Sequence, residues 1–251
     1  MNREATDLAG VRHIAYETLG STNAEALARA RAGERGPLWI TAAVQSAGRG
    51  RRGSAWVSTP GNLFATLLLT EPSRPDVASQ LSFVAALALH DALAECAPHL
   101  GPLLKLKWPN DLLLGGAKLA GILIEAESDP AFSVVIGIGV NCAAHPGNTP
   151  YPATDLSAAG ALVAPRQVLV ALARAFDSRL AQWQRGQAFA GVRADWLKRA
   201  AGLGQDIRVR LPERELSGRF QGLDDNGRLL LLAENGVTTV TAGEVFDLGS
   251  R

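Results

Sequence analysis

Residues 48–53 read Gly-Arg-Gly-Arg-Arg-Gly and place three guanidinium groups on a glycine-rich backbone. Arginine forks and free backbone N–H groups bind carboxylates and phosphates. The glycine spacing is also that of a dinucleotide-binding loop, but such a loop opens a helix. Here Pro60 follows closely, the next apolar segment reads as a strand, and the Lys-Ser/Thr ending of a P-loop is missing. The loop therefore predicts a local anion site, and a solvated basic turn is the alternative.

Two further stretches carry groups suited to a phosphorylated ligand. Residues 107–111 read Lys-Trp-Pro-Asn-Asp, and their Asn110-Asp111 pair could bind a base edge or a metal-bound phosphate. Residues 115–125 read GGAKLAGILIE and place Lys118 between glycines at the mouth of a buried strand. An ammonium group there is costly unless an anion meets it. Together the three stretches predict a site that binds a negatively charged small molecule.

Composition restricts the setting of such a site. The chain has 251 residues, 47% of them hydrophobic, and a formal net charge of +1, so cationic function must be local and nucleic acid is not the expected main partner. Cys96 and Cys142 read as reduced thiols of a cytoplasmic protein without structural zinc. The polar N-terminus lacks a secretion signal. The apolar stretches Leu63–Leu69 and Phe83–Leu89 are too short to span a bilayer.

Periodicity predicts the elements that position these groups. Thr22 and Glu25 have capping-box spacing ahead of an alanine-rich helix that Gly33 can end. Steps of three and four predict further helices, and aliphatic or β-branched runs predict strands. The helices are expected over Asp76–Ala97, Leu169–Trp183 and Phe189–Ala200, and the strands near Trp39–Val44, Leu63–Thr70, Leu103–Trp108, Leu119–Glu125 and Phe132–Val140. A short apolar stretch near Ile14–Tyr16 is not assigned to an element.

The pattern changes at Gly202-Leu203-Gly204. From Asp206 onward apolar and polar residues alternate, and Asn226-Gly227 is a hairpin signal. About five short strands are expected over Asp206–Leu211, Leu216–Gln221, Leu229–Leu232, Val237–Val240 and Val245–Leu248. We therefore expect an α/β (α+β) domain over residues 1–201, with a mixed central sheet and flanking helices, and a small SH3-like β-barrel domain over residues 202–251.

In order and spacing these motifs closely resemble the biotin protein ligase family across nearly the whole chain. The resemblance rests on Ser21-Thr22-Asn23, Gln45, residues 48–53 with Trp56, Lys107–Asp111, Lys118–Ile122 and Gly137–Asn141. It implies a two-step reaction in which biotin and MgATP form biotinyl-5′-adenylate, and a lysine of a biotin carboxyl carrier domain then attacks the anhydride. A carboxylate is already a nucleophile, so this chemistry needs charge neutralisation and alignment rather than a Ser-His-Asp triad.

The resemblance also implies roles for individual residues. Lys118, Arg49 and Asp111 are the expected catalytic groups, and Asp111 is the candidate magnesium ligand. Biotin is expected to contact Ser21, Thr22, Asn23, Gln45, Arg49, Gly50, Arg51, Lys118 and Gly121. ATP and the adenylate are expected to contact Arg51, Arg52, Trp56, Asn110, Asp111, Lys118 and Asn141. The Pro- and Gly-rich segment 143–155 is expected to be a mobile lid over adenine without assigned contacts.

Each assignment has a structural alternative. Thr22 can cap its helix, Trp56 and Trp108 can be core aromatics, and Asn110-Asp111 and Asn141 can be turn and strand-ending residues. The four histidines show no ligand spacing. Ser54-Ala55 occupy positions where many relatives carry a further basic residue, which puts the strength of phosphate binding in question.

Other functions remain open at this stage. Lipoate or octanoate ligases and transferases share the fold but would not need the Ser-Thr-Asn and Gln set. A non-catalytic biotin or nucleotide sensor and an RNA-binding module are alternatives of other classes. Only about twenty residues precede Ser21, too few for a winged-helix domain, so no DNA binding is expected. No membrane partner is expected, and a homodimer remains an alternative to a monomer.

Overall fold

A computed structural model describes the backbone of residues 3–247 and the side chains of residues 8–246. Eight strands form a mixed sheet in the order β1-β2-β3-β4-β8-β7-β6-β5, in which only β2 and β3 pair in parallel. The strands are β1 (Arg3–Leu8), β2 (Val11–Leu19), β3 (Leu38–Gln45), β4 (Leu63–Thr70), β5 (Leu104–Lys107), β6 (Asp111–Leu114), β7 (Ala117–Glu127) and β8 (Ser133–Val140).

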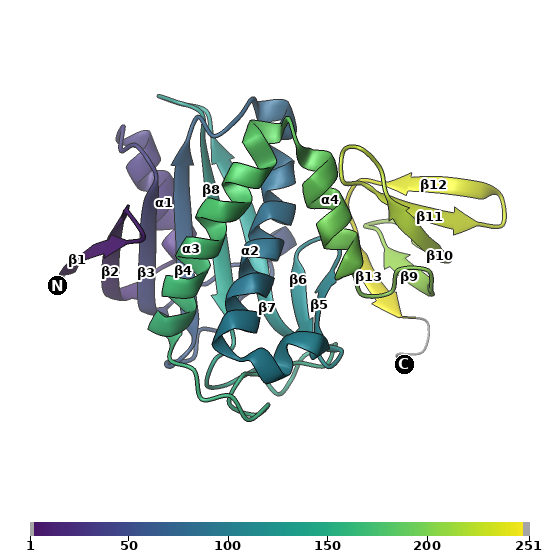
Figure 1. The fold of residues 1–251 in the computed structure, drawn as a ribbon, viewed down its shortest axis with the longest axis horizontal. Helices are drawn as coiled ribbons and strands as arrows, with labels where there is room; N and C mark the ends of the chain where they lie inside the picture. Colours follow the sequence, from purple (N-terminus) through teal and green to yellow (C-terminus); the bar gives the residue numbers. More distant parts are fainter. Residues whose placement is uncertain (1–2, 248–251) are drawn as a thin grey trace.

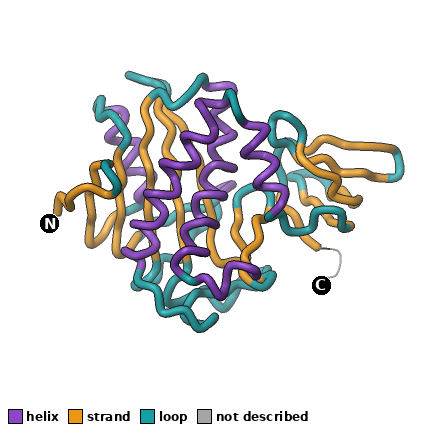
Figure 2. Tube along the Cα trace, in the orientation of Figure 1, coloured by secondary structure: helices purple, strands orange, loops and turns teal. Residues whose placement is uncertain are grey.

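Helices cover both faces of this sheet. Three of them, α2 (Leu81–Cys96), α3 (Pro165–Trp183) and α4 (Phe189–Lys198), lie on the face that Figures 1 and 2 show in front. The short helix α1 (Thr22–Arg31) packs on the opposite face through Ala26, Leu27 and Ala30, in a cluster with Ile40 and Leu68. The described residues also form short 3-10 turns at Arg51–Gly53, Pro75–Gln80, Pro98–Leu103 and Gln184–Gly186.

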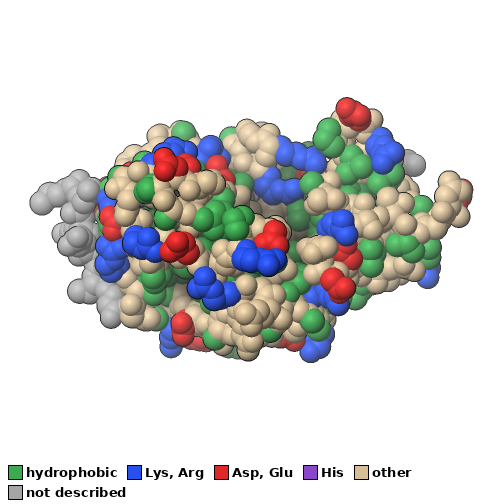
Figure 3. Space-filling view, turned by 90° about the horizontal axis from the view of Figure 1, so that it is seen from above, with side chains coloured by type: hydrophobic (Ala, Val, Ile, Leu, Met, Phe, Trp, Pro, Cys, Tyr) green, Lys and Arg blue, Asp and Glu red, His purple; other side chains and the backbone are tan. Residues whose placement is uncertain are grey.

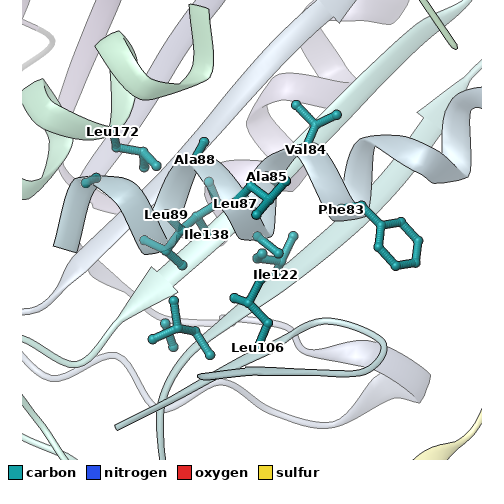
Figure 4. Close-up of a cluster of buried hydrophobic side chains, with 14 of the residues drawn as sticks. Phe83, Val84, Ala85, Leu87, Ala88, Leu89, Leu106, Ile122, Ile138 and Leu172 are labelled. Atoms are coloured by element: carbon teal, nitrogen blue, oxygen red, sulfur yellow. The ribbon is translucent and has the colours of Figure 1, made fainter. Parts of the chain in front are cut away.

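The main core lies between the sheet and helices α2 and α3. Figure 4 shows Leu87 and Leu89 of α2 beside Leu106, Ile122 and Ile138 of the sheet. The segment Pro75–Cys96 is long and apolar enough to cross a membrane by length and composition alone, but 67% of its most apolar window is buried inside the protein. Its apolar character is therefore explained by its place in the core.

A second sheet, antiparallel and five-stranded, follows in the order β12-β11-β10-β9-β13 and fits the small β-barrel that the alternation predicts. Its strands are β9 (Asp206–Arg210), β10 (Glu215–Leu223), β11 (Leu229–Ala233), β12 (Gly236–Val240) and β13 (Glu244–Asp247). Gly227 lies in the turn between β10 and β11, and its carbonyl accepts a 3.1 Å hydrogen bond from Trp108 Nε1. This buried bond ties the second sheet to the 107–111 segment.

The structure corrects some details of the predicted elements. Ser21, not Thr22, caps α1, since the Ser21 side chain accepts from the Ala24 N–H, whereas Thr22 is the first helical residue. Thr22–Glu25 is therefore not a capping box, and Glu25 pairs with Arg29 instead. The helix expected from Asp76 starts as a 3-10 turn and becomes α-helical at Leu81. Strands β1, β2 and β6 were not predicted, although β2 contains the short apolar stretch near Ile14–Tyr16, and Leu248 lies outside the described residues.

One buried titratable side chain lies on the sheet far from the motifs. His13 on β2 is 4% exposed, and its Nε2 lies 2.8 Å from Thr41 Oγ1. Burial, and after it the positive charge of Arg166, lower the pKa of the His13 imidazole from 6.5 to about 4. The folded chain thus keeps this imidazole neutral in a range where the unfolded chain protonates it.

This difference predicts a loss of stability in mild acid. Because the unfolded chain binds the His13 proton near pH 6.5 and the folded chain only near pH 4, the free energy of unfolding should fall as pH drops between these values. The loss at about pH 5, relative to about pH 7.5, should be about 2 kcal/mol. Urea unfolding at both pH values should show this loss for the wild type and a smaller one for His13→Gln, which cannot titrate; equal losses would contradict the assignment.

Candidate active site

Four segments meet at one edge of the large sheet, and one of them is the arginine loop, residues 48–53. Strands β3 and β8 both run antiparallel to β4, so their ends at Gln45 and Val140 lie at the same edge. The arginine loop leaves this edge after β3, segment 141–155 leaves it after β8, and α1 starts there because β2 is parallel to β3. Strand β7 is antiparallel to β8 and begins there, close to Lys118.

A cavity of about 630 Å³ opens at this edge, on the face that α1 covers. It is lined by every predicted site residue except Asn141, which means Ser21, Thr22, Asn23, Gln45, Arg49, Gly50, Arg51, Arg52, Trp56, Asn110, Asp111, Lys118 and Gly121. The surface turned towards the viewer in Figure 3 instead carries acidic and basic side chains mixed together, without a continuous basic patch.

The cavity floor is made of neighbouring glycines. Gly121 of β7 pairs with Gly139 of β8, and Gly137 lies two residues away on the same face. A Cβ atom at Gly121 or Gly139 would lie closer than 3.0 Å to the Trp56 indole, and one at Gly137 would clash equally with the Asn23 side-chain amide. The glycines thus provide the space in which Trp56 and Asn23 lie against the sheet.

A chain of polar side chains lines one end of this floor. Gln45 Oε1 accepts from the backbone N–H of Thr22 at 2.8 Å and from the Thr22 hydroxyl at 3.1 Å. Thr66 Oγ1 on β4 is fully buried and lies 2.8 Å from Thr22 Oγ1 and 2.7 Å from Asn23 Oδ1. Asn23 Nδ2 donates in turn to Glu125 Oε2 at 2.9 Å and to the Leu123 carbonyl at 3.3 Å.

The chain of hydrogen bonds determines where the Thr22 hydroxyl donates and what it can accept. Because Asn23 turns its Nδ2 towards two acceptors, its Oδ1 faces Thr66, whose single proton must be donated to that oxygen. The Thr22 proton can then go only to Thr66 Oγ1 or Gln45 Oε1. Its free lone pair is left for a ligand, so Thr22 is suited to accept a hydrogen bond from a ligand N–H group.

Lys118 marks the other end of the floor. Its Nζ lies 2.8 Å from Asp111 Oδ1 in an ion pair whose angles fall outside those of a hydrogen bond, and both side chains are largely buried. The same Nζ lies 5.6 Å from the Trp56 ring centroid and 5.1 Å from that of Tyr151. Two aromatic faces and one carboxylate therefore hold this ammonium in the cavity wall.

The arginine loop forms a narrow hairpin with its cations pointing apart. Arg51 Nη1 lies 3.2 Å from Asn110 Oδ1 and 3.4 Å from the Gly243 carbonyl of the second sheet. Burial, and after it the charge of Arg52, lower the pKa of Arg51 from its ordinary value. Arg49 instead reaches away to Glu125, at an Nη2–Oε2 distance of 3.0 Å. Arg51 is thus a half-buried cation whose charged form a nearby anionic ligand would stabilise.

Both asparagines of the nucleotide set make hydrogen bonds to the backbone. Asn110 Nδ2 donates to the Ile122 carbonyl at 2.7 Å, which leaves Asn110 on the cavity wall. Asn141 is 3% exposed, and its Nδ2 donates to the Thr154 carbonyl at 3.0 Å. In this structure Asn141 therefore anchors segment 143–155 from behind the cavity.

Segment 143–155 is held at both ends and reaches over Lys118. Asn62 Oδ1 accepts from three successive backbone N–H groups at residues 142–144, and His145 Nδ1 lies 2.6 Å from Asp155 Oδ2. The Lys118 backbone pairs with Pro152 and Thr154. Between these anchors, Pro146 and residues 148–151 line the cavity.

Several residues in or next to the cavity were not among the predicted site residues. Thr66, Glu125 and Tyr151 contact motif residues only because distant segments fold together, and Asn62 has no motif of its own. The second sheet contributes Gly243, Glu244 and Val245 to the cavity lining, which no local pattern indicated.

The side chains present fit a metal that arrives with a nucleotide. No group of three or more His, Cys, Asp or Glu residues suited to a metal occurs in the part of the chain described. Mg²⁺ commonly takes one or two protein carboxylates together with substrate phosphates, and Asp111 offers such a carboxylate inside the cavity.

Comparison with known proteins agrees with this geometry. Residues 21–141 match the model of the biotin/lipoate A/B protein ligase family, and residues 202–246 match that of the biotin protein ligase C-terminal domain. The chain is 46% identical to a biotin–[acetyl-CoA-carboxylase] ligase of Paracoccus denitrificans over 90% of its own length and 96% of that protein. It is 36% identical to the enzyme of the same name from Mycobacterium tuberculosis, over 91% and 86% of the two chains.

A solved structure has the same fold. The biotin protein ligase of Aquifex aeolicus in complex with biotin and ATP superimposes with a TM-score of 0.79 at 25% identity, over 93% of this chain and 97% of that one. The relatives span both family models and nearly the full described fold. The chain therefore belongs to the biotin protein ligase family.

Proposed function

We propose that this chain activates biotin with MgATP to biotinyl-5′-AMP and transfers the biotinyl group to a lysine of the biotin carboxyl carrier domain of a carboxylase. The observation that carries this proposal is a single cavity. At one end it has the polar side chains around Thr22, which suit a ureido group, and at the other it has the cations Lys118 and Arg51. Its relatives are named for this ligation, and the Aquifex structure holds biotin and ATP.

The Thr22 end of the cavity suits the biotin head. A ureido ring presents N–H donors and a carbonyl acceptor, so it needs a fixed acceptor and a fixed donor at the same place. The Thr22 oxygen provides the acceptor, and Gln45 Nε2, which reaches Ser58 at 3.3 Å, keeps a second N–H to donate. The fused apolar ring can then pack against the Trp56 indole, which itself lies over Gly121 and Gly139.

The Lys118 end suits the reacting groups. The biotin carboxylate oxygen attacks the α-phosphorus of ATP, and the bond between that phosphorus and the departing pyrophosphate oxygen breaks. Lys118 and Arg51 neutralise the negative charge that gathers at this phosphorus, and they need no rearrangement because the fold already holds them. Mg²⁺, held by Asp111 and phosphate oxygens, would neutralise further phosphate charge.

Transfer follows from the same arrangement. The carrier lysine amine attacks the acyl carbon of the mixed anhydride, the amine loses a proton, and AMP leaves. Segment 143–155 and the arginine loop border the cavity on two sides, and they would keep water from the anhydride until the carrier arrives. The role of Arg49 at the ligand carboxylate remains a prediction, because Arg49 is paired with Glu125 in this structure.

The remaining assignments stay predictions. They include the roles of the individual site residues, the division of the chain at residues 201 and 202, the cytoplasmic location, the monomer or homodimer state, and the lack of DNA and membrane partners. Among the other functions, lipoate ligation has the support of the shared family model alone, whereas the C-terminal match is to biotin protein ligases.

The first test of the proposal is substrate dependence. Pyrophosphate release from ATP should require biotin and should not be replaced by lipoate or octanoate, because these acids lack the N–H groups that the Thr22 oxygen accepts. Pyrophosphate release measured with each acid in turn gives the answer. Equal release with lipoate would favour the lipoate ligases, and biotin binding without release would favour a sensor.

Lys118 offers a direct test of the anion end. Lys118→Ala should lower the rate of adenylation by at least about 100-fold, since a preorganised charge at the phosphorus is lost, while the melting temperature stays within a few degrees. Lys105→Ala removes an exposed lysine from the same sheet and serves as the matched control. Wild-type adenylation by folded Lys118→Ala would exclude the assigned role.

The arginine loop should retain the reactive intermediate. Arg51→Gly removes the contacts to Asn110 and Gly243, so adenylate synthesis should persist while biotinyl-5′-AMP escapes faster and labels lysines of a bystander protein. Streptavidin blots of added serum albumin would measure that labelling, with the exposed Arg214→Gly as control. If Arg51→Gly labels the bystander no faster than the wild type at an equal adenylation rate, the loop does not retain the intermediate and is a simple anion-binding turn.

A further inference from the structure

Glu125 connects the arginine loop to the hydrogen-bonded side chains of Asn23 and Thr66. These lie at the end of the cavity that suits a ureido ring. The Glu125 Oε2 atom accepts both from Arg49 Nη2 at 3.0 Å and from Asn23 Nδ2 at 2.9 Å. One carboxylate oxygen thus joins a residue of the loop to a residue of α1. Arg51 does not share this partner, because its guanidinium lies against Asn110 and Gly243.

The carboxylate is held in place before Arg49 reaches it. Asn23 is 3% exposed, its Oδ1 accepts from the fully buried Thr66, and its Nδ2 also donates to the Leu123 carbonyl. These bonds set the orientation of the amide and therefore the position of Glu125. When the ion pair forms, only the Arg49 side chain loses conformational freedom, because Glu125 is already held. This smaller loss of entropy strengthens a pair that is partly exposed.

Holding Arg49 also holds the loop backbone. Residues 48–56 form a narrow hairpin, in which the Gly50 N–H donates to the Ser54 carbonyl at 2.7 Å and the Trp56 N–H donates to the Gly48 carbonyl at 2.9 Å. Arg49 is bridged to Ala55 across this hairpin. An anchor on Arg49 is therefore transmitted to Trp56, whose indole lies on the glycine floor.

We propose that Glu125 is a positioning residue for biotin recognition, which acts through Arg49 to hold the arginine loop against the end of the cavity that receives the ureido ring. The proposal rests on the proposed function for the identity of the ligand, but the anchoring of the loop does not. Glu125 also ties the loop to the Thr22 oxygen, through Asn23 and Thr66, so the head of biotin and the loop are fixed by one set of bonds.

The same strand offers a matched control. Glu127, two residues further along β7, pairs with Arg31 of α1. That pair resembles the Arg49–Glu125 pair in its residue types, but neither Arg31 nor Glu127 lines the cavity. Glu127→Gln therefore removes a comparable charge without touching the loop.

Proteolysis of the unliganded protein tests the anchor without any ligand. Trypsin cleaves after arginine, so a loosened loop exposes the bonds after Arg49, Arg51 and Arg52. Glu125→Gln should speed cleavage there by roughly three- to tenfold, and Glu127→Gln should leave it at the wild-type rate. Loop cleavage of Glu125→Gln at the wild-type rate would overturn the proposal.

Biotin binding tests the consequence in a double-mutant cycle. Calorimetry on the wild type, Glu125→Gln, Arg49→Gln and the double variant should show biotin dissociation constants raised roughly three- to tenfold in both single variants, with no further rise in the double variant. Because Arg51 keeps its own contacts to Asn110 and Gly243, the KM for ATP should rise less than the biotin dissociation constant. Additive losses in the double variant, or unchanged biotin affinity in Glu125→Gln, would overturn the role.

The two experiments separate this proposal from the proposed function. If the wild type neither binds biotin nor releases pyrophosphate with it, the proposed ligation and the role in biotin recognition both fail. Loop cleavage then still shows whether Glu125 anchors the loop. If the wild type is active and both Glu125 experiments match Glu127→Gln, only the inference about Glu125 fails.

Discussion

The site depends on three glycines of the sheet, which leave space because they have no side chain. Strands β7 and β8 place Gly121 beside Gly139, with Gly137 next to them, on a face where neighbouring positions would normally carry aliphatic side chains. A methyl group at any of the three would collide with Trp56 or Asn23. Glycine weakens a strand, so this cost must be carried by the rest of the sheet and by the helices packed behind it. In return, Trp56 and Asn23 can lie close against the sheet, where both line the cavity.

Around this floor the fold holds its charges in advance of any ligand. Lys118 is held by Asp111 and two aromatic rings, Arg51 by Asn110 and the Gly243 carbonyl, and Arg49 by Glu125. The partners of these cations are either neutral groups or single carboxylates. An anionic substrate can therefore make its own contacts to the cations without moving them far. Electrostatic catalysis works best with such preset groups, because no reorganisation is needed during the reaction.

Much of the architecture could be predicted because its signals are local. The strand Leu63–Thr70 and the end of α3 at Trp183 lie where runs and periodicity placed them, and the alternation after Asp206 anticipated the second sheet. The failures have physical causes. The four-residue strand β6 is too short to show a period, and the cap of α1 moved to Ser21 because the Thr22 hydroxyl bonds to Gln45, a residue from another strand.

The motifs alone indicate which chemistry the protein can support. The arginine loop, Lys118 and Asn110-Asp111 carry the groups that bind phosphate, and thirteen of the fourteen predicted site residues line the cavity because their motifs sit at one edge of the sheet. How those groups are used depends on the contacts between segments. Thr66, Glu125 and Tyr151 come from strands or segments far away in the chain, and Asn141 turns behind the cavity to bond Thr154. Such roles depend on distances between segments distant in sequence, which spacing along one chain does not encode.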